Sequence, residues 1–162
     1  SISDKSLFDA KYWLKLSNLY RKTNQINEEK IVLERIIDFD PLNFRALSRL
    51  VYVYSKLKDN QKASDFYKRM RNSFVYFKDR SGFGPYHKSA IKTSIMVKDY
   101  QFSNFVCKDL LIKNSLPEHY VLCGVLEYKY LDKSAAMQLL VKAIELDVDV
   151  EIPEEIRKDL KI

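Results

Sequence analysis

Glycine, proline, histidine and cysteine are all scarce in this chain of 162 residues. It contains three glycines, four prolines, two histidines and two cysteines. So few glycines and prolines leave no room for a disordered linker. The histidines and cysteines lack the close spacing of zinc ligands, so no metal site is expected. No apolar run approaches the ~18 residues that a membrane-spanning helix needs, so no membrane span is expected.

Catalytic motifs are missing as well. The sequence has no G-x-S-x-G or H-E-x-x-H motif, and the segment from Ser81 to Pro85 lacks the lysine and the helix register of a phosphate-binding loop. The carboxylate pairs Glu28–Glu29 and Glu154–Glu155 are expected to be solvated surface and helix-start charges. His87 and His119 are expected near helix starts, as surface or capping residues. The sequence therefore predicts that the protein is not an enzyme and uses no cofactor.

Apolar residues recur at the spacing of α-helices along the chain. Tyr12, Leu16 and Leu19 share one helical face, and Leu140 and Ile144 repeat the pattern near the other end. Residues that interrupt helices fall between such segments, at 24–27, 40–43, 81–85, 114–117 and 152–153. No window alternates with the period of two that is typical of strands. The expected fold class is all-α.

One of these helical segments carries a recognisable motif. The residues from Trp13 to Tyr20 form W-x2-L-S-x2-Y, and Pro41 and Asn43 follow where a unit of 34 residues ends. This motif resembles the tetratricopeptide repeat, a helix–turn–helix unit. In that family each unit has an apolar face that it buries by stacking on its neighbours.

The resemblance extends along nearly the whole chain. A second unit begins at Phe44 and is clear, whereas a third follows about six extra residues and has His87 and Ser94 where the family has tryptophan and tyrosine. A fourth unit begins near Pro117. The expected architecture is one domain, 1–162, a solenoid with repeats near 10–43, 44–77, 84–116 and 117–150 and a capping helix at 153–161.

The resemblance also implies a function. In this family the first helix of each repeat lines a concave groove that binds other proteins. The groove positions expected to contact a partner are Lys11, Lys15, Asn18, Arg45, Arg49, Tyr52, Lys88 and Lys92. Most are basic, while acidic residues gather on the second helices, so the net charge of +6 is expected to concentrate in the groove. The predicted role is an adaptor or scaffold that holds an acidic peptide or helix of a partner protein.

One branch of the family grips a C-terminal carboxylate with lysine, asparagine and arginine. Asn18 matches that clamp, but Leu14, Arg49, Pro85 and Ser89 stand where its other members belong. The clamp itself is therefore rejected. The basic groove remains the prediction, and an ordinary solvated helix face is the alternative interpretation of its lysines.

A nucleic-acid-binding helical-repeat protein is the alternative function. A pI near 9.1 and interleaved tyrosines are compatible with it. The modest charge surplus and the tetratricopeptide signature argue against it. A non-catalytic enzyme subunit is a third class that the sequence does not separate from the adaptor. Abundant Lys, Ile, Asn, Tyr and Phe are typical of an AT-rich genome and suggest a bacterial source.

Two further features permit two interpretations each. Aromatic residues near the six-residue insertion either fill a widened gap between repeats or form an exposed patch for a partner or a weak homodimer; they are Phe74, Tyr76, Phe77, Phe83 and Tyr86. Cys107 and Cys123 fall at packing positions of adjacent helices. They act there either as buried thiols or as a disulfide, which would suit an oxidising compartment.

Overall fold

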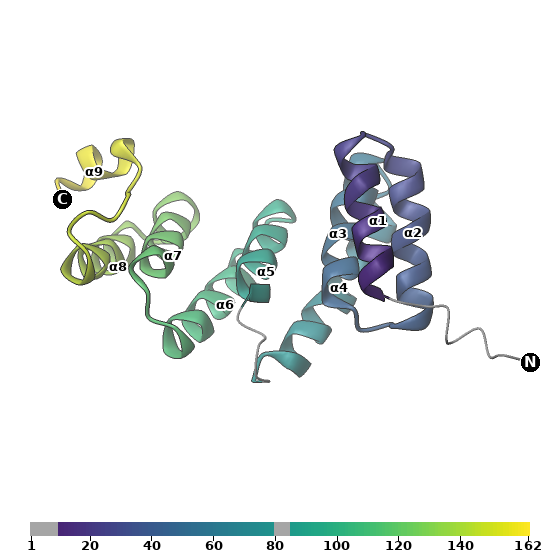
Figure 1. The fold of residues 1–162 in the computed structure, drawn as a ribbon. Coiled ribbons are helices and arrows are strands. Elements are labelled where there is room, and N and C mark those ends of the chain that lie inside the picture. The colour runs from purple at the N-terminus through teal and green to yellow at the C-terminus, as the bar shows by residue number, and fades with distance from the viewer. Residues whose placement is uncertain (1–9, 80–84) are drawn as a thin grey trace, which may run out of the picture. The chain divides into compact units, whose positions relative to one another are not determined.

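The computed structural model describes residues 10–79 and 85–162, and the secondary structure in these ranges is entirely helical (Figure 1). This confirms the all-α prediction. The helices are α1 (Ala10–Lys22), α2 (Ile26–Phe39), α3 (Phe44–Lys56), α4 (Asn60–Phe77), α5 (Pro85–Met96), α6 (Tyr100–Lys113), α7 (Pro117–Tyr130), α8 (Lys133–Leu146) and α9 (Glu154–Leu160). None of the described helices is long and apolar enough to cross a membrane.

The helices divide into two compact units, residues 1–80 and 81–162. In the first unit, α1 packs on α2, α2 on α3, and α3 on α4. In the second unit, α5 packs on α6, α6 on α7, and α7 on α8. Each unit thus consists of two helix–turn–helix pairs, and α9 follows the last pair. The four predicted pairs and the predicted C-terminal capping helix are confirmed.

The first helix of three pairs ends in the same backbone conformation. Asn24, Lys58 and Lys98 each adopt a positive φ, of 56°, 61° and 62°. The amide of the following residue then bonds to a carbonyl five residues earlier, as Gln25 does to Tyr20 at 2.9 Å. This is the closure that ends many helices when one residue enters the left-handed region.

The second helix of each later pair begins with an aspartate. Asp59, Asp99 and Asp132 accept a hydrogen bond from the backbone amide three residues on, at 3.1, 3.1 and 2.7 Å. Such a side-chain cap satisfies an amide that the helix itself leaves unpaired, and it stabilises the helix by about 1 kcal/mol. Gln25 takes this place before α2 and makes no side-chain cap.

The core of the first unit is aliphatic and aromatic. Leu33 and Ile36 of α2 and Leu47 and Leu50 of α3 are at most 1 % exposed. Phe74 of α4, one of the aromatic residues near the insertion, is fully buried and is joined there by Phe44 and Met70. Burying each such side chain contributes about 1.5–3 kcal/mol, which holds the two pairs together.

The second unit has a closely packed core with a covalent link. Cys107 of α6 and Cys123 of α7 form a disulfide with their Cα atoms 5.7 Å apart. Of the two interpretations of these cysteines, the structure has the disulfide. Next to it, Gly124 lies so close to α8 that an added Cβ would stand 2.7 Å from Cγ of Leu140. Helix α9 then covers the end of the unit by burying Ile156 completely.

The third pair replaces the tryptophan and tyrosine of the family signature with buried polar groups. His87 is 1 % exposed, and its Nε2 lies 2.7 Å from Oδ2 of Asp109. The expectation that His87 is a surface or capping residue was wrong, because it occupies the position that tryptophan fills in the first repeat. Ser94 is buried too, and its hydroxyl lies 2.6 Å from that of Ser103.

Candidate functional site

The predicted groove residues of the first unit lie on α1 and α3. On α1, Lys11, Lys15 and Asn18 are exposed. On α3, Arg45 is exposed, whereas Arg49 and Tyr52 are half-buried. All six belong to one unit.

Arg49 is bound to a carboxylate of its own chain. Its Nε and Nη2 atoms donate to Oε1 and Oε2 of Glu29, at 2.5 and 3.0 Å. Glu29 of α2 is 2 % exposed, so the expectation of a solvated surface carboxylate was wrong for this residue. A bidentate pair with one partner fully buried fixes the guanidinium in place. It also neutralises the charge of Arg49.

The pair explains a departure of Glu29 from the repeat pattern. Glu29 stands at position twenty of its repeat, where the other repeats have Ala63, Ser103 and Ala136. A carboxylate buried there needs a partner. The guanidinium of Arg49, in the next repeat, supplies it. Sequence reasoning missed this pair, although a glutamate at a small-residue position was a visible signal.

Arg49 also organises the aromatic surface of α3. Its guanidinium carbon lies 4.3 Å from the ring centroid of Tyr52, and Nζ of Lys56 lies 5.6 Å from the same centroid. Cations on the face of an aromatic ring are attracted by its quadrupole. The three side chains therefore form a row along the helix, and this row is held at one end by buried Glu29.

This row forms one wall of a cleft of about 410 Å³. The cleft is open to solvent and lies between the C-terminal turn of α1, the start of α2, and α3. Its lining residues are Tyr20, Arg21, Asn24, Gln25, Ile26, Glu29, Arg49, Tyr52 and Lys56. Because Arg49 and Glu29 neutralise each other, Arg21 and Lys56 give the cleft a positive character.

Glu34 and Tyr54 make a second contact between these two repeats. The Tyr54 hydroxyl donates to Oε1 of Glu34, and Tyr54 is 3 % exposed. Burial, and next the hydrogen bond to Glu34, raise the pKa of Tyr54 well above its usual range. With Glu29, two of the acidic residues of α2 are therefore engaged within the fold and do not balance the basic residues at the cleft.

The remaining predicted contacts belong to the second unit. Lys88 and Lys92 are exposed and lie one turn apart on α5. Of the aromatic residues near the insertion, Tyr76 is 60 % exposed at the end of α4 and packs its ring against Phe77 at 4.7 Å. Phe83 lies outside the described residues.

The second histidine is also paired within the fold. His119 is buried, and its Nδ1 lies 2.8 Å from the carbonyl of Asn114, which it helps to anchor at the start of α7. No group of three metal-binding side chains occurs within residues 10–79 and 85–162. The cleft of the first unit, with Arg49 and Tyr52 in its wall, is the candidate site.

The sequence profile of the tetratricopeptide repeat matches residues 10–41, which are α1, α2 and the turn between them. The remaining helical pairs have the same helix–turn–helix arrangement. Residues 10–41 thus match a tetratricopeptide repeat, and the chain has the fold of tetratricopeptide-repeat structures. Tetratricopeptide repeats are in general a non-catalytic fold that binds other proteins. No curated protein is significantly similar to the chain in sequence.

Solved structures share the fold at low sequence identity. A tetratricopeptide repeat protein from Parabacteroides merdae is 14 % identical, with a TM-score of 0.63 over 87 % of this chain and 54 % of its own. A crystal structure of MamA protein is 13 % identical, with a TM-score of 0.61 over 86 % of this chain and 73 % of its own. MamA from Desulfovibrio magneticus is 16 % identical, with a TM-score of 0.59 over 87 % and 77 %.

Proposed function

We propose that this protein is a non-catalytic adaptor that binds an acidic segment of a partner protein in the cleft of its first unit. The observation that carries the proposal is the charge of that cleft. Glu29 is neutralised by Arg49 at 2.5 Å, which leaves Arg21 and Lys56 to act on a ligand. Two uncompensated cations beside a concave, partly apolar surface favour an acidic partner.

The lining residues suggest how such a segment is held. Carboxylates of the partner pair with Arg21 and Lys56, which both line the cleft. Apolar side chains of the partner, between its carboxylates, pack on the flat rings of Tyr20 and Tyr52. Tyrosine loses little conformational entropy on such binding. A short peptide or one or two turns of a helix suit a cleft of about 410 Å³.

Arg49 acts in this proposal as a positioning residue. Its guanidinium donates two hydrogen bonds to Glu29 and lies over the ring of Tyr52. It therefore keeps the Tyr52 ring oriented and contributes little net charge. Lys11, Lys15, Asn18 and Arg45 are proposed as outer contacts of the same partner on the first unit. Lys88 and Lys92 are proposed as contacts on the second unit.

The position of Arg49 determines which variants test the proposal. Arg49→Glu would place a second carboxylate against buried Glu29 and destabilise the fold itself. Arg21→Glu combined with Lys56→Glu reverses the exposed charges and leaves the buried pair intact. Lys68→Glu combined with Arg71→Glu is the matched control, because it makes the same charge change on exposed residues of α4.

The experiment measures fluorescence anisotropy with a labelled library of acidic peptides and a second library in which lysine replaces every acidic residue. We expect binding of the acidic library alone, at least tenfold weaker binding by Arg21→Glu/Lys56→Glu, and little change for the control. Affinity should fall as salt rises. Equal binding of both libraries, or equal loss in both variants, would overturn the proposal. Stronger binding of a single-stranded RNA would overturn it in favour of the nucleic-acid alternative.

A further inference from the structure

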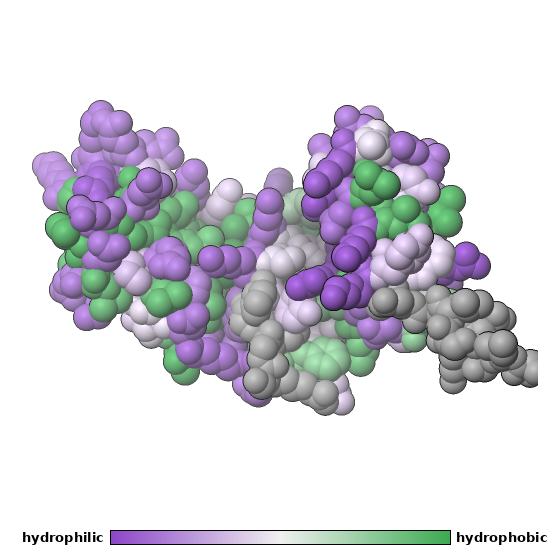
Figure 2. All heavy atoms as spheres, in the orientation of Figure 1, coloured by the Kyte–Doolittle hydropathy of each residue, from purple (hydrophilic) through white to green (hydrophobic). Residues whose placement is uncertain are grey.

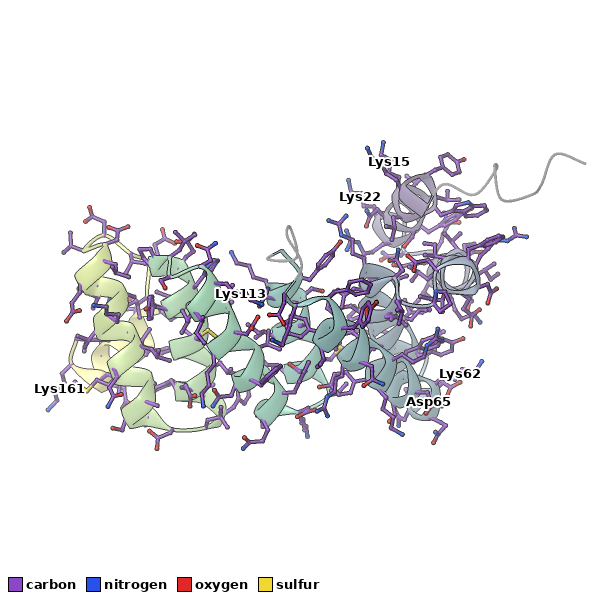
Figure 3. The ribbon with its side chains drawn as sticks, turned by 90° about the horizontal axis from the view of Figure 1, so that it is seen from below. Lys15, Lys22, Lys62, Asp65, Lys113 and Lys161 are labelled. Carbon is purple, nitrogen blue, oxygen red and sulfur yellow. A yellow bond between two sulfur atoms is a disulfide. The ribbon has the colours of Figure 1, made fainter. Side chains whose placement is uncertain are left out.

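Helix α1 presents a stripe of alternating apolar and basic residues to solvent. Tyr12, Lys15, Leu19 and Lys22 are spaced by three, four and three residues, so they share one face of the helix. Tyr12 is 60 % and Leu19 55 % exposed. Hydrophobic residues reach the surface over α1 and α2 in Figure 2, and Lys15 and Lys22 project to the same side of α1 in Figure 3.

The corresponding stripe of α3 is covered. Counted from the start of each repeat, Tyr12 and Leu19 correspond to Ala46 and Val53, which are both fully buried. Both α2 and α4 pack on α3, and α2 supplies Glu29 to Arg49, the residue that corresponds to Lys15. In α7 the corresponding residues, His119 and Leu126, are buried as well. A chain that covers α1 in the same way must therefore bring aliphatic side chains and a carboxylate.

The other end of the chain has this chemistry. Residues 145–159 contain seven acidic and two basic residues, whereas α1 contains four basic residues and no acidic ones. Beside these carboxylates, Leu146 is 47 % and Val148 73 % exposed. The residues next in sequence line a cleft of about 540 Å³; they are Asp149, Val150, Glu151, Ile152, Pro153 and Arg157.

We infer that the chain self-associates head to tail, with the α1 stripe of one copy docking on residues 146–151 of a second copy. Tyr12 and Leu19 then cover Leu146 and Val148. Lys15 and Lys22 pair with Asp147, Asp149 and Glu151, as Arg49 pairs with Glu29 inside each copy. A symmetric contact between two α1 stripes is disfavoured, because it opposes lysine with lysine.

This contact involves two different surfaces, so it is heterologous and adds copies until a ring closes or the chain of copies ends. The apolar area is small and the charges lie at the surface. Self-association is therefore weak, and it weakens further between about 0.1 M and 1 M salt, where the Debye length falls from about 10 Å to 3 Å.

Two complementary variants test the geometry by sedimentation equilibrium. Lys15→Glu/Leu19→Glu blocks the stripe, and Val148→Lys/Glu151→Lys blocks the acidic end. Ile31→Glu, at a residue of α2 that is 62 % exposed, is the control for adding charge to an apolar surface. Circular dichroism verifies that each variant keeps its helix content.

We expect the wild-type chain to exceed its mass of 19.2 kDa as concentration rises, and each blocked variant to associate at least tenfold more weakly. An equimolar mixture of the two blocked variants has one open stripe and one open acidic end. It should therefore form a species of twice the chain mass and no larger one. A wild-type chain that stays monomeric at every concentration overturns the inference. Association that persists in both blocked variants would also overturn it, as would a mixture of the two variants that does not associate.

Discussion

The hydroxyl of Tyr54 donates a hydrogen bond to the carboxylate of Glu34, which belongs to the second helix of the preceding repeat. The fourth repeat has the same arrangement with other residues, because Asn104 donates to Glu127 at 2.9 Å. Glu127 occupies the repeat position of Tyr54. Both contacts join helices of neighbouring repeats, so they fix how one repeat stacks on the next.

Removing the Tyr54 hydroxyl should change stability at alkaline pH. The pKa of Tyr54 is raised in the folded state, so the folded chain holds this proton above pH 10, where the unfolded chain releases it. The stability that Tyr54 contributes is therefore complete below pH 10 and is lost as pH rises beyond it. We expect Tyr54→Phe to lose less stability than wild type between pH 9 and about 11. Urea unfolding at each pH measures this difference, and parallel pH profiles of the two chains would contradict it.

Breaking the buried ion pair should be costly. Glu29→Gln leaves the guanidinium of Arg49 without its carboxylate, and removing one partner of a buried pair costs about 3 kcal/mol of unfolding free energy. Exposed Glu28 is the control, because Glu28→Gln should change the free energy by no more than about 0.5 kcal/mol. Urea denaturation measures both values. A double-mutant cycle with Arg49→Gln should show that the two losses are not additive.

Gly124→Ala should destabilise the second unit, although alanine is the better helix former. In an exposed helix this substitution stabilises by about 1 kcal/mol. Here the new Cβ would stand 2.7 Å from Cγ of Leu140, whose side chain is fully buried. Overpacking of this kind costs about 1–3 kcal/mol. Thermal unfolding followed by circular dichroism gives the sign, and a rise in Tm would contradict the close packing of α7 on α8.

Reduction of the disulfide should lower the stability of the chain. Cys107 and Cys123 are 16 residues apart, and a cross-link of that span stabilises by about 3 kcal/mol. We expect dithiothreitol to lower the urea midpoint of the wild-type chain. The variant Cys107→Ala/Cys123→Ala has no bond to reduce, so its midpoint should not respond. A wild-type midpoint that is also unresponsive would show that the bond contributes nothing.

The helices and their pairing were predictable from the sequence because apolar spacing and breakers coincide. Proline opens α5 and α7, and Asp40 to Asn43 separate α2 from α3. The contacts of charged residues were not predictable in the same way. Periodicity places Glu29 near a helix start, where an acidic residue is favourable in any case. It does not reveal an arginine in the next repeat that meets this carboxylate.

His87 shows a related limit. Its neighbours in sequence suggest a helix start and hence the surface, but its repeat position is the one that Trp13 holds. In this repeat the position decides the burial of the residue, so the histidine is buried and paired with Asp109. The sequence yields the groove positions only as a list, which stays a prediction. The neutralisation of Arg49 depends on a side-chain contact between two helices and emerged only in three dimensions.

The left-handed residues Asn24, Lys58 and Lys98 have a consequence for how these repeats diverge. Asn24 and Lys58 are 34 residues apart, and Lys58 and Lys98 are 40 apart, which is one repeat plus the insertion. The third repeat lacks the tryptophan and the tyrosine but still turns at the same place. The turn therefore does not depend on these signature side chains. A repeat whose sequence no longer shows the signature can still be aligned with the others by the left-handed residue at its turn.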